Sequence, residues 1–244
     1  MPVMVPNPLS AAELLEAAAI SRERPPVDAD VYLAALGAAG LSLDETAALS
    51  IGVRDAVLTR LYRSMFGPRL ELATNCPHCA ARLDVSLTTD ELLMDLDTDA
   101  YSPIEIDRRR FDVRPVNSAD LAAAAGMPDI ETARALLASR CLVPIEGEDV
   151  PAVLSDDEID AVAAALAVVD PASDRYVSLR CFKCEAAWDA PIDIARALGA
   201  EVEAAADTLM DDIHDLALSY HWSEEAILAL APARRRGYLQ RLRG

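Results

Sequence analysis

The pattern of hydrophobic and polar positions along the chain predicts more helices than strands. The clearest helix is expected over residues 194–220, where large apolar residues recur at steps of three or four and acidic residues occupy the opposite side. Residues 28–67 also read as helical, up to a stop signal at Gly67 and Pro68. Shorter helices, some of which open with a capping serine followed by acidic residues, are expected at 10–20, 118–125, 129–141 and 155–169.

Short runs of alternating apolar residues predict a small amount of β structure. Residues 69–87 and 176–192 each read as strand, turn and strand, and residues 104–116 repeat that order around a charged turn. Residues 89–96 read as a short acidic link. Aromatic residues make up only 5% of the chain, so the core is expected to be aliphatic and mainly helical. Together these patterns predict an α+β fold that is mostly helical, with a small β element.

The order of these elements predicts how the chain is organised. A helix and a proline-rich linker occupy residues 1–27, and a single α+β domain is expected over residues 28–244. Within that domain the two strand pairs at 69–87 and 176–192 bracket a mixed insertion, residues 88–175. A helical C-terminal segment, residues 194–244, follows the second pair. With 244 residues, the chain is long enough to bury a substantial core.

Two Cys-x-x-Cys pairs carry the strongest chemical signal. Each pair is followed by three residues, a large apolar residue, an aspartate and an alternating apolar run, so one local design is used twice. A two-residue gap lets both thiolates of a tight turn reach one tetrahedral ion, but two thiolates leave that ion half ligated. We therefore predict one structural zinc site, shared by the two turns, with the ligands Cys76, Cys79, Cys181 and Cys184.

Other states of these cysteines remain open at the sequence level. Separate sites would need a further ligand such as His78, which we expect to face solvent instead. Disulfides or metal-free thiols are the main alternatives to zinc. Residues 1–9 lack the basic region and apolar core of a secretory signal, so reduced thiols are expected. A catalytic redox pair would need only one copy of the motif. The fifth cysteine, Cys141, lies in an apolar stretch and is expected to be a buried free thiol.

The net charge of the chain limits the classes of partner that we expect. The formal net charge of −19 opposes non-specific phosphate binding, so nucleic acid is an unlikely partner. No apolar stretch approaches the roughly 20 residues of a membrane span, and neither a membrane partner nor a membrane location is expected. The last residues, 234–243, are by contrast rich in arginine, and read either as a solvated helical face or as a docking tail.

Catalytic signatures are missing from the sequence. There is no Gly-x-Ser-x-Gly elbow, no phosphate-binding loop and no dinucleotide fingerprint. Three histidines, none placed to form a triad, suggest no open metal site. We therefore expect a protein that is not an enzyme and has no small-molecule substrate.

Two stretches of the chain carry a family resemblance. The first is residues 51–87, where a helix, a Phe-Gly-Pro-Arg-Leu segment and the first cysteine pair follow one another. The second comprises the second cysteine pair, Trp188, and a Trp-Ser-Glu … Arg-Arg-x-Tyr-Leu pattern that begins at Trp222 and ends at Leu239. In these stretches the chain resembles the baseplate hub proteins and hub assembly chaperones of T-even-type phages, which are also found beside phage-like contractile injection systems. The middle of the chain matches only in the order of its elements.

This resemblance implies a non-enzymatic role in building a contractile-tail baseplate, with baseplate or hub proteins as partners. The protein would act in the cytoplasm of a bacterium or infected host cell, or become part of the tail particle. A cytoplasmic zinc-ribbon adaptor unrelated to tails, and a nucleic-acid-binding zinc protein, are the alternatives.

The stretch after the long helix holds the candidate partner contacts. It carries more large apolar groups than a short tail needs, and aromatic residues and arginine dominate interface hot spots. Part of this set is expected to pack on the body of the protein. The candidates are Trp222, Arg235, Arg236, Tyr238, Leu239 and Arg241.

Overall fold

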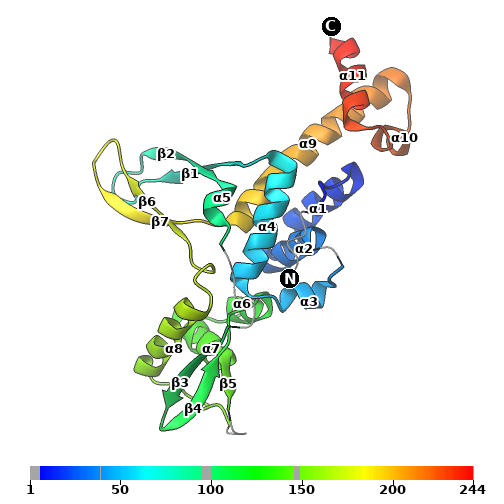
Figure 1. Cartoon of the computed structure of the whole chain (residues 1–244). Coiled ribbons are helices and arrows are strands. Elements are labelled where there is room, and N and C mark those ends of the chain that lie inside the picture. The colour runs from blue at the N-terminus through cyan, green and yellow to red at the C-terminus, as the bar shows by residue number, and fades with distance from the viewer. Residues whose placement is uncertain (1–5, 39, 95–99, 146–148, 244) are drawn as a thin grey trace.

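The computed structural model describes residues 6–38, 40–94, 100–145 and 149–243. A central layer of helices carries three projections: a pair of β-hairpins, a mixed insertion and a C-terminal helical segment (Figure 1). The helices are α1 (Ala11–Glu23), α2 (Pro26–Gly37), α3 (Leu43–Ala47), α4 (Ile51–Phe66), α5 (Thr89–Leu92), α6 (Ser118–Ala125), α7 (Ile130–Cys141), α8 (Asp156–Val169), α9 (Ile194–Tyr220), α10 (Glu224–Leu228) and α11 (Pro232–Arg243). The strands are β1 (Arg69–Asn75), β2 (Arg82–Thr88), β3 (Ser102–Ile106), β4 (Arg109–Val113), β5 (Leu142–Pro144), β6 (Tyr176–Arg180) and β7 (Ala187–Pro191). The α+β class predicted from the sequence is confirmed.

Several helices begin at a reciprocal capping box. At α8, the Glu158 N–H donates to the Ser155 hydroxyl (3.4 Å), and the Ser155 N–H donates to the Glu158 carboxylate (2.8 Å). The same arrangement opens α1, α3 and α6. Each box satisfies two backbone N–H groups that a helix start leaves without partners. This local chemistry explains why these helix starts could be read from the sequence.

The central layer is formed by α1, α2, α4 and the first half of α9. Its core is aliphatic, with Leu33, Leu58, Leu61 and Leu198 almost fully buried. The N-terminal helix α1 belongs to this layer, and only two residues separate α1 from α2. The buried members of this central cluster are Ala17, Ala18, Leu33, Ala34, Leu58, Leu61, Tyr62, Leu70, Leu92, Ile194, Ala195, Leu198, Val202 and Ala206.

The insertion has its own core. Strands β3, β4 and β5 form an antiparallel sheet, and its buried residues Phe111 and Val113 pack in one cluster with residues of α7 and α8. Cys141 is buried in that cluster as a free thiol, as predicted, and burial raises its pKa to about 11. The sequence missed β5, a three-residue strand that directly follows α7. It also missed the short helix α5, which lies in the acidic link expected over residues 89–96. Residues 95 and 96 of that link lie outside the described residues.

The insertion meets the central layer at the start of α4. The N–H of Gly52 donates to the carboxylate of Asp170 (2.8 Å), and the N–H of Ile51 donates to the carbonyl of Val116 (3.0 Å). A Cβ atom on residue 52 would lie 2.0 Å from an Asp170 carboxylate oxygen, so only glycine fits there. This contact fixes the place where the insertion joins the layer.

A buried carboxylate joins three parts of the insertion. Asp120, on α6, is fully buried, accepts two hydrogen bonds from the Arg114 guanidinium (2.7 and 3.0 Å) and one from Arg140 (2.8 Å). Burial raises the pKa of Asp120, but these bonds, together with the Asn117 N–H, outweigh burial and lower it. The charge of Asp120 is therefore satisfied inside the protein.

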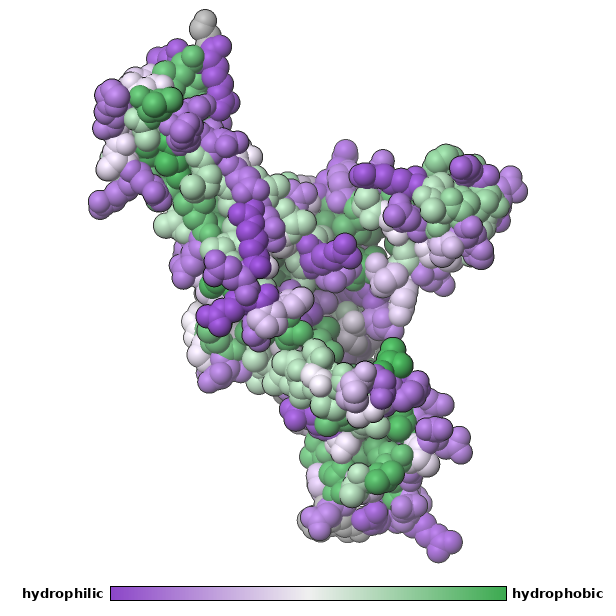
Figure 2. Space-filling view, turned by 180° about the vertical axis from the view of Figure 1, so that it is seen from behind, coloured by the Kyte–Doolittle hydropathy of each residue, from purple (hydrophilic) through white to green (hydrophobic). Residues whose placement is uncertain are grey.

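The second half of α9 projects from the central layer and carries α10 and α11 (Figure 1). A small C-terminal cluster holds them together through the buried residues Leu209, Ile213, Leu216, Ile227 and Leu239. Seen from behind, hydrophobic residues reach the surface among hydrophilic ones on both this segment and the insertion (Figure 2). None of the helices in the described ranges combines the length and hydropathy that crossing a bilayer requires.

Candidate metal centre

The first cysteine pair lies in the turn of the β1–β2 hairpin. The N–H of Cys76 donates to the carbonyl of Ala81 (2.8 Å), and the N–H of Ala80 donates back to the carbonyl of Cys76 (2.9 Å). Ala80 takes the left-handed conformation, with φ of 57°. This tight turn brings Cys76 and Cys79 to the same end of the hairpin.

The second pair lies in an equivalent turn of the β6–β7 hairpin. The N–H of Cys181 donates to the carbonyl of Ala186 (2.9 Å), the N–H of Glu185 donates to the carbonyl of Cys181 (3.0 Å), and Glu185 has φ of 59°. The duplicated sequence has therefore folded into a duplicated turn, with the same hydrogen bonds and the same left-handed residue after the second cysteine.

The two turns meet with their four sulfur atoms together. The Cys76 Sγ lies 3.6 Å from the Cys184 Sγ, and the Cys79 Sγ lies 3.6 Å from the Cys181 Sγ. All four sulfurs lie within 4.8 Å of one another, close enough to hold a metal ion. The distances are far longer than the roughly 2.05 Å of a disulfide, and all four residues are free cysteines. The predicted convergence of these four residues is confirmed.

Two thiols of the cluster, Cys181 and Cys184, have pKa values shifted in opposite directions. Burial raises the pKa of Cys181, but the N–H groups of Cys184 and Lys183 point at its sulfur and lower the pKa to about 6. The Ala186 N–H lowers the pKa of Cys184, whereas burial and the neighbouring sulfurs raise it to about 12. Thiolates this close repel one another, so the fully ionised set requires a bound cation.

The residues that repeat after each cysteine pair lie in the strands next to the turns and form cross-strand pairs. Leu83 pairs with Thr74 across the first hairpin, and Trp188 pairs with Leu179 across the second. All four are half-buried, while the aspartates that follow Leu83 and Trp188 are exposed. The shared pattern thus builds an apolar inner face on each hairpin. His78, as expected, is exposed and lies outside the four-sulfur group.

The candidate partner residues divide into two groups. Leu239 is only 4% exposed and belongs to the C-terminal cluster, so it is core rather than contact surface. Trp222 and Tyr238 pack against that cluster and form an aromatic group with Tyr220, at ring-centroid distances of 4.8 to 5.6 Å. These residues hold α11 against α9. The sequence did not single out Tyr220 as part of this group.

Two of the three predicted arginines of α11 are exposed. The Arg235 side chain is only 13% exposed and lies 3.8 Å from the Asp212 carboxylate. Arg236 and Arg241 are exposed, and the Arg241 guanidinium donates to the carbonyl of Gly237 (2.5 Å). Of the predicted set, Arg236 and Arg241 are therefore the most accessible to a partner.

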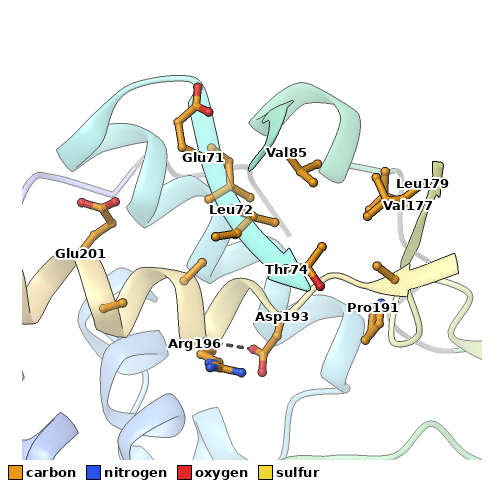
Figure 3. A pocket seen from close by; sticks show the side chains of 15 residues that line it. Glu71, Leu72, Thr74, Val85, Val177, Leu179, Pro191, Asp193, Arg196 and Glu201 are labelled. Atoms are coloured by element: carbon orange, nitrogen blue, oxygen red, sulfur yellow. Dashed lines mark hydrogen bonds between the residues drawn. The ribbon is translucent and has the colours of Figure 1, made fainter. Parts of the chain in front are cut away.

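A cleft between the hairpins and α9 was not anticipated from the sequence (Figure 3). It has a volume of about 280 Å³, and its walls are β1, parts of β6 and β7, and the first turns of α9. No local signal marks it, because it exists only through the way in which the two hairpins stand over the helix. Its lining residues include Leu72, Thr74, Val85, Val177, Leu179, Pro191, Ala197 and Ala200.

No protein-family model matches the chain, and no curated protein or solved structure is significantly similar to it.

Proposed function

We propose that the protein is a non-enzymatic structural or assembly factor of a contractile-tail baseplate, acting through protein–protein contacts and held together by one structural zinc ion. The convergence of four cysteine sulfurs from two equivalent turns carries the zinc part of this proposal. In a tetrahedral site with Zn–S distances of about 2.3 Å, sulfurs stand about 3.8 Å apart. The two distances of 3.6 Å are close to that value.

Zinc would act here on stability rather than on chemistry. Each hairpin forms its own two-stranded sheet, and an isolated two-stranded hairpin is marginally stable in water. An ion bound to Cys76, Cys79, Cys181 and Cys184 would join the two hairpins at their turns, so that its binding free energy contributes to folding. Four protein ligands leave no open coordination position, which is typical of structural sites.

The C-terminal segment is the proposed contact with the baseplate. Residues 226–244 contain five arginines and no acidic residue, in a chain whose net charge is −19. This segment projects from the central layer, where a partner can reach it (Figure 1). A baseplate or hub protein with an acidic surface would complement this positive charge. The resemblance to contractile-tail proteins implies that class of partner. The site of action would be the cytoplasm, with or without later incorporation into the tail.

Charge reversal at Arg236, one of the exposed arginines of α11, tests the proposal. In cells that assemble contractile tails, the tagged protein should recover baseplate or hub proteins, and Arg236→Glu should weaken this recovery at least about tenfold. Arg24→Glu, which makes the same charge change at an exposed position after α1, is the matched control and should recover normal amounts. Recovery of no tail protein by the unchanged chain would favour an adaptor role unrelated to tails.

A further inference from the structure

We infer that the free edge of β1 binds an extended segment of a partner protein as an added strand, and that this segment has alternating apolar residues and a basic end. This inference extends the proposed protein-binding role to a second surface, separate from the C-terminal arginines.

The hydrogen-bond register determines which backbone groups of β1 are available. The bond from the Cys76 N–H to the Ala81 carbonyl makes these two residues a hydrogen-bonded pair. Such pairs alternate along antiparallel strands, so the even-numbered residues of β1 bond to β2. The N–H and C=O groups of Glu71 and Ala73 consequently point to the opposite edge.

That edge has no strand beside it in the described part of the chain. There β1 pairs with β2 alone, and the β6–β7 hairpin forms a separate sheet. Glu71 and Ala73 are both exposed. Unpaired N–H and C=O groups on a strand edge are a template for another strand. Neither a lysine nor a proline lies within β1 to block such pairing.

The edge borders the cleft rather than open solvent. Five consecutive residues of β1, 70–74, line the cleft. Since side chains alternate between the two faces of a strand, an unbroken run of lining residues means that β1 lines the cleft along an edge as well as a face. The wall on the side of the second hairpin includes Val177 and Leu179 (Figure 3). The wall formed by α9 includes two small residues, Ala197 and Ala200, which leave space for the side chains of a ligand. An apolar side chain on every second residue of an added strand could fill this space.

The charges of the cleft select a basic segment. Three of the four charged residues that line it are acidic: Glu71, Asp193 and Glu201, against Arg196. Glu71 and Glu201 lie at the same end of the cleft, although the Glu71 side chain points away from α9 (Figure 3) and its carboxylate also accepts the Ser86 hydroxyl (2.9 Å). Burial raises the pKa of Tyr62, and the charges of Glu201 and Glu71 raise it as well. Asp193, by contrast, caps α9 by accepting the Arg196 N–H (2.9 Å). A lysine or arginine at one end of the segment would therefore be attracted to the acidic end of the cleft, where Glu201 and Glu71 lie.

A synthetic peptide tests the inference with the purified full-length, zinc-loaded protein. The probe is acetyl-Lys-Val-Thr-Val-Thr-Val-Lys-amide, and its control has glutamate in place of both lysines. Binding of the lysine peptide should protect the amides of Glu71 and Ala73 from hydrogen exchange. The glutamate peptide should bind at least about tenfold more weakly. Absence of binding, equal binding of the two peptides, or binding that leaves both amides exchanging at the free rate would each overturn the inference.

Two proline variants provide the matched comparison. Ala73→Pro removes an N–H from the cleft edge, whereas Asp84→Pro removes one from the outer edge of β2, and neither breaks a β1–β2 bond. Ala73→Pro should weaken peptide binding at least about tenfold and Asp84→Pro should not; equal losses would contradict strand addition at β1. If Ala73→Pro fails to fold, Glu71→Lys takes its place and should weaken binding of the lysine peptide.

The proposed baseplate role can fail while strand addition at β1 holds, because its test, Arg236→Glu, leaves this cleft unchanged.

Discussion

The sulfur of Cys76 lies 3.6 Å from the sulfur of Cys184, although 108 positions separate the two residues in the chain. The whole insertion lies between them in the sequence. A second contact, in which Asp170 accepts the Gly52 N–H, also joins the end of the insertion to the chain that precedes it. The four-cysteine centre and this hydrogen bond therefore close the same long stretch of chain at two places. Losing the centre should loosen the hairpins while the insertion keeps its own core.

The effect of metal on stability should distinguish the four clustered cysteines from Cys141. Cys181→Ser removes a ligand, and we expect it to lower the free energy of unfolding by at least about 2 kcal/mol, with faster proteolysis of the hairpins. Cys141→Ser places a hydroxyl in an apolar core and should cost about 1–3 kcal/mol. Thermal melts with and without a chelator tell the two effects apart. The chelator should lower the melting temperature of Cys141→Ser but leave that of Cys181→Ser nearly unchanged, and an equal response would count against the shared centre.

The buried carboxylate of Asp120 should matter more for stability than surface ion pairs do. Asp120→Asn removes the negative charge that Arg114 and Arg140 share, and we expect a loss of about 2–4 kcal/mol in urea unfolding. Asp160→Asn is the control, because Asp160 pairs with Arg134 at 2.7 Å where both side chains are largely exposed. That change should cost no more than about 1 kcal/mol.

The same carboxylate should make folding sensitive to acid. Its pKa is lower in the folded protein than the ordinary value of 3.8. The stabilisation is therefore complete above about pH 4 and is lost as the pH falls below that value towards the folded pKa. Wild type should lose stability in this range more steeply than Asp120→Asn. Parallel acid titrations followed by circular dichroism would show the difference, and identical slopes would contradict it.

Asp30 should have the opposite pH dependence. Burial, together with the charges of Asp193 and Asp55, raises its pKa from 3.8 to about 6, despite the opposing effect of Arg54. The folded protein therefore binds an extra proton between about pH 4 and 6, and stability falls as the pH rises through this window. Asp30→Asn should increase the free energy of unfolding at pH 7.5 by about 1–3 kcal/mol and have little effect near pH 4.

An exposed aspartate supplies the control for that experiment. The side chain of Asp84 is 79% exposed, and Asp84→Asn should leave the unfolding curve unchanged at both pH values. A loss of stability in Asp30→Asn at pH 7.5 would mean that the ion pair with Arg54, at 3.8 Å, outweighs the burial of the charge.

Removal of α11 should affect the protein locally. Leu239 packs with Leu209, Ile213 and Leu216 in the C-terminal cluster, whereas no residue of α11 belongs to the central cluster. Deleting residues 232–244 should therefore speed amide exchange in the second half of α9 and leave the central layer protected and the metal bound. Loss of protection in α4 would show that the tail supports the whole fold.

The sequence predicted those features that depend on neighbours along the chain. Capping pairs such as Ser155 and Glu158 act within one helical turn, and the duplicated cysteine turns are local as well. The tertiary arrangement was harder to predict. Nothing local to Leu239 distinguishes a buried leucine from an exposed one in an arginine-rich helix. The cleft depends on the relative placement of two hairpins, which no periodicity specifies.

Native mass spectrometry of the purified chain tests the central claim most directly, because it counts ions per molecule. We predict a mass that corresponds to one zinc ion per chain in the wild type, and loss of that ion in Cys76→Ser and in Cys181→Ser alike, since each hairpin supplies two of the four ligands. Two ions per chain, no ion, or full retention of zinc after either substitution would contradict a single centre shared by the two hairpins.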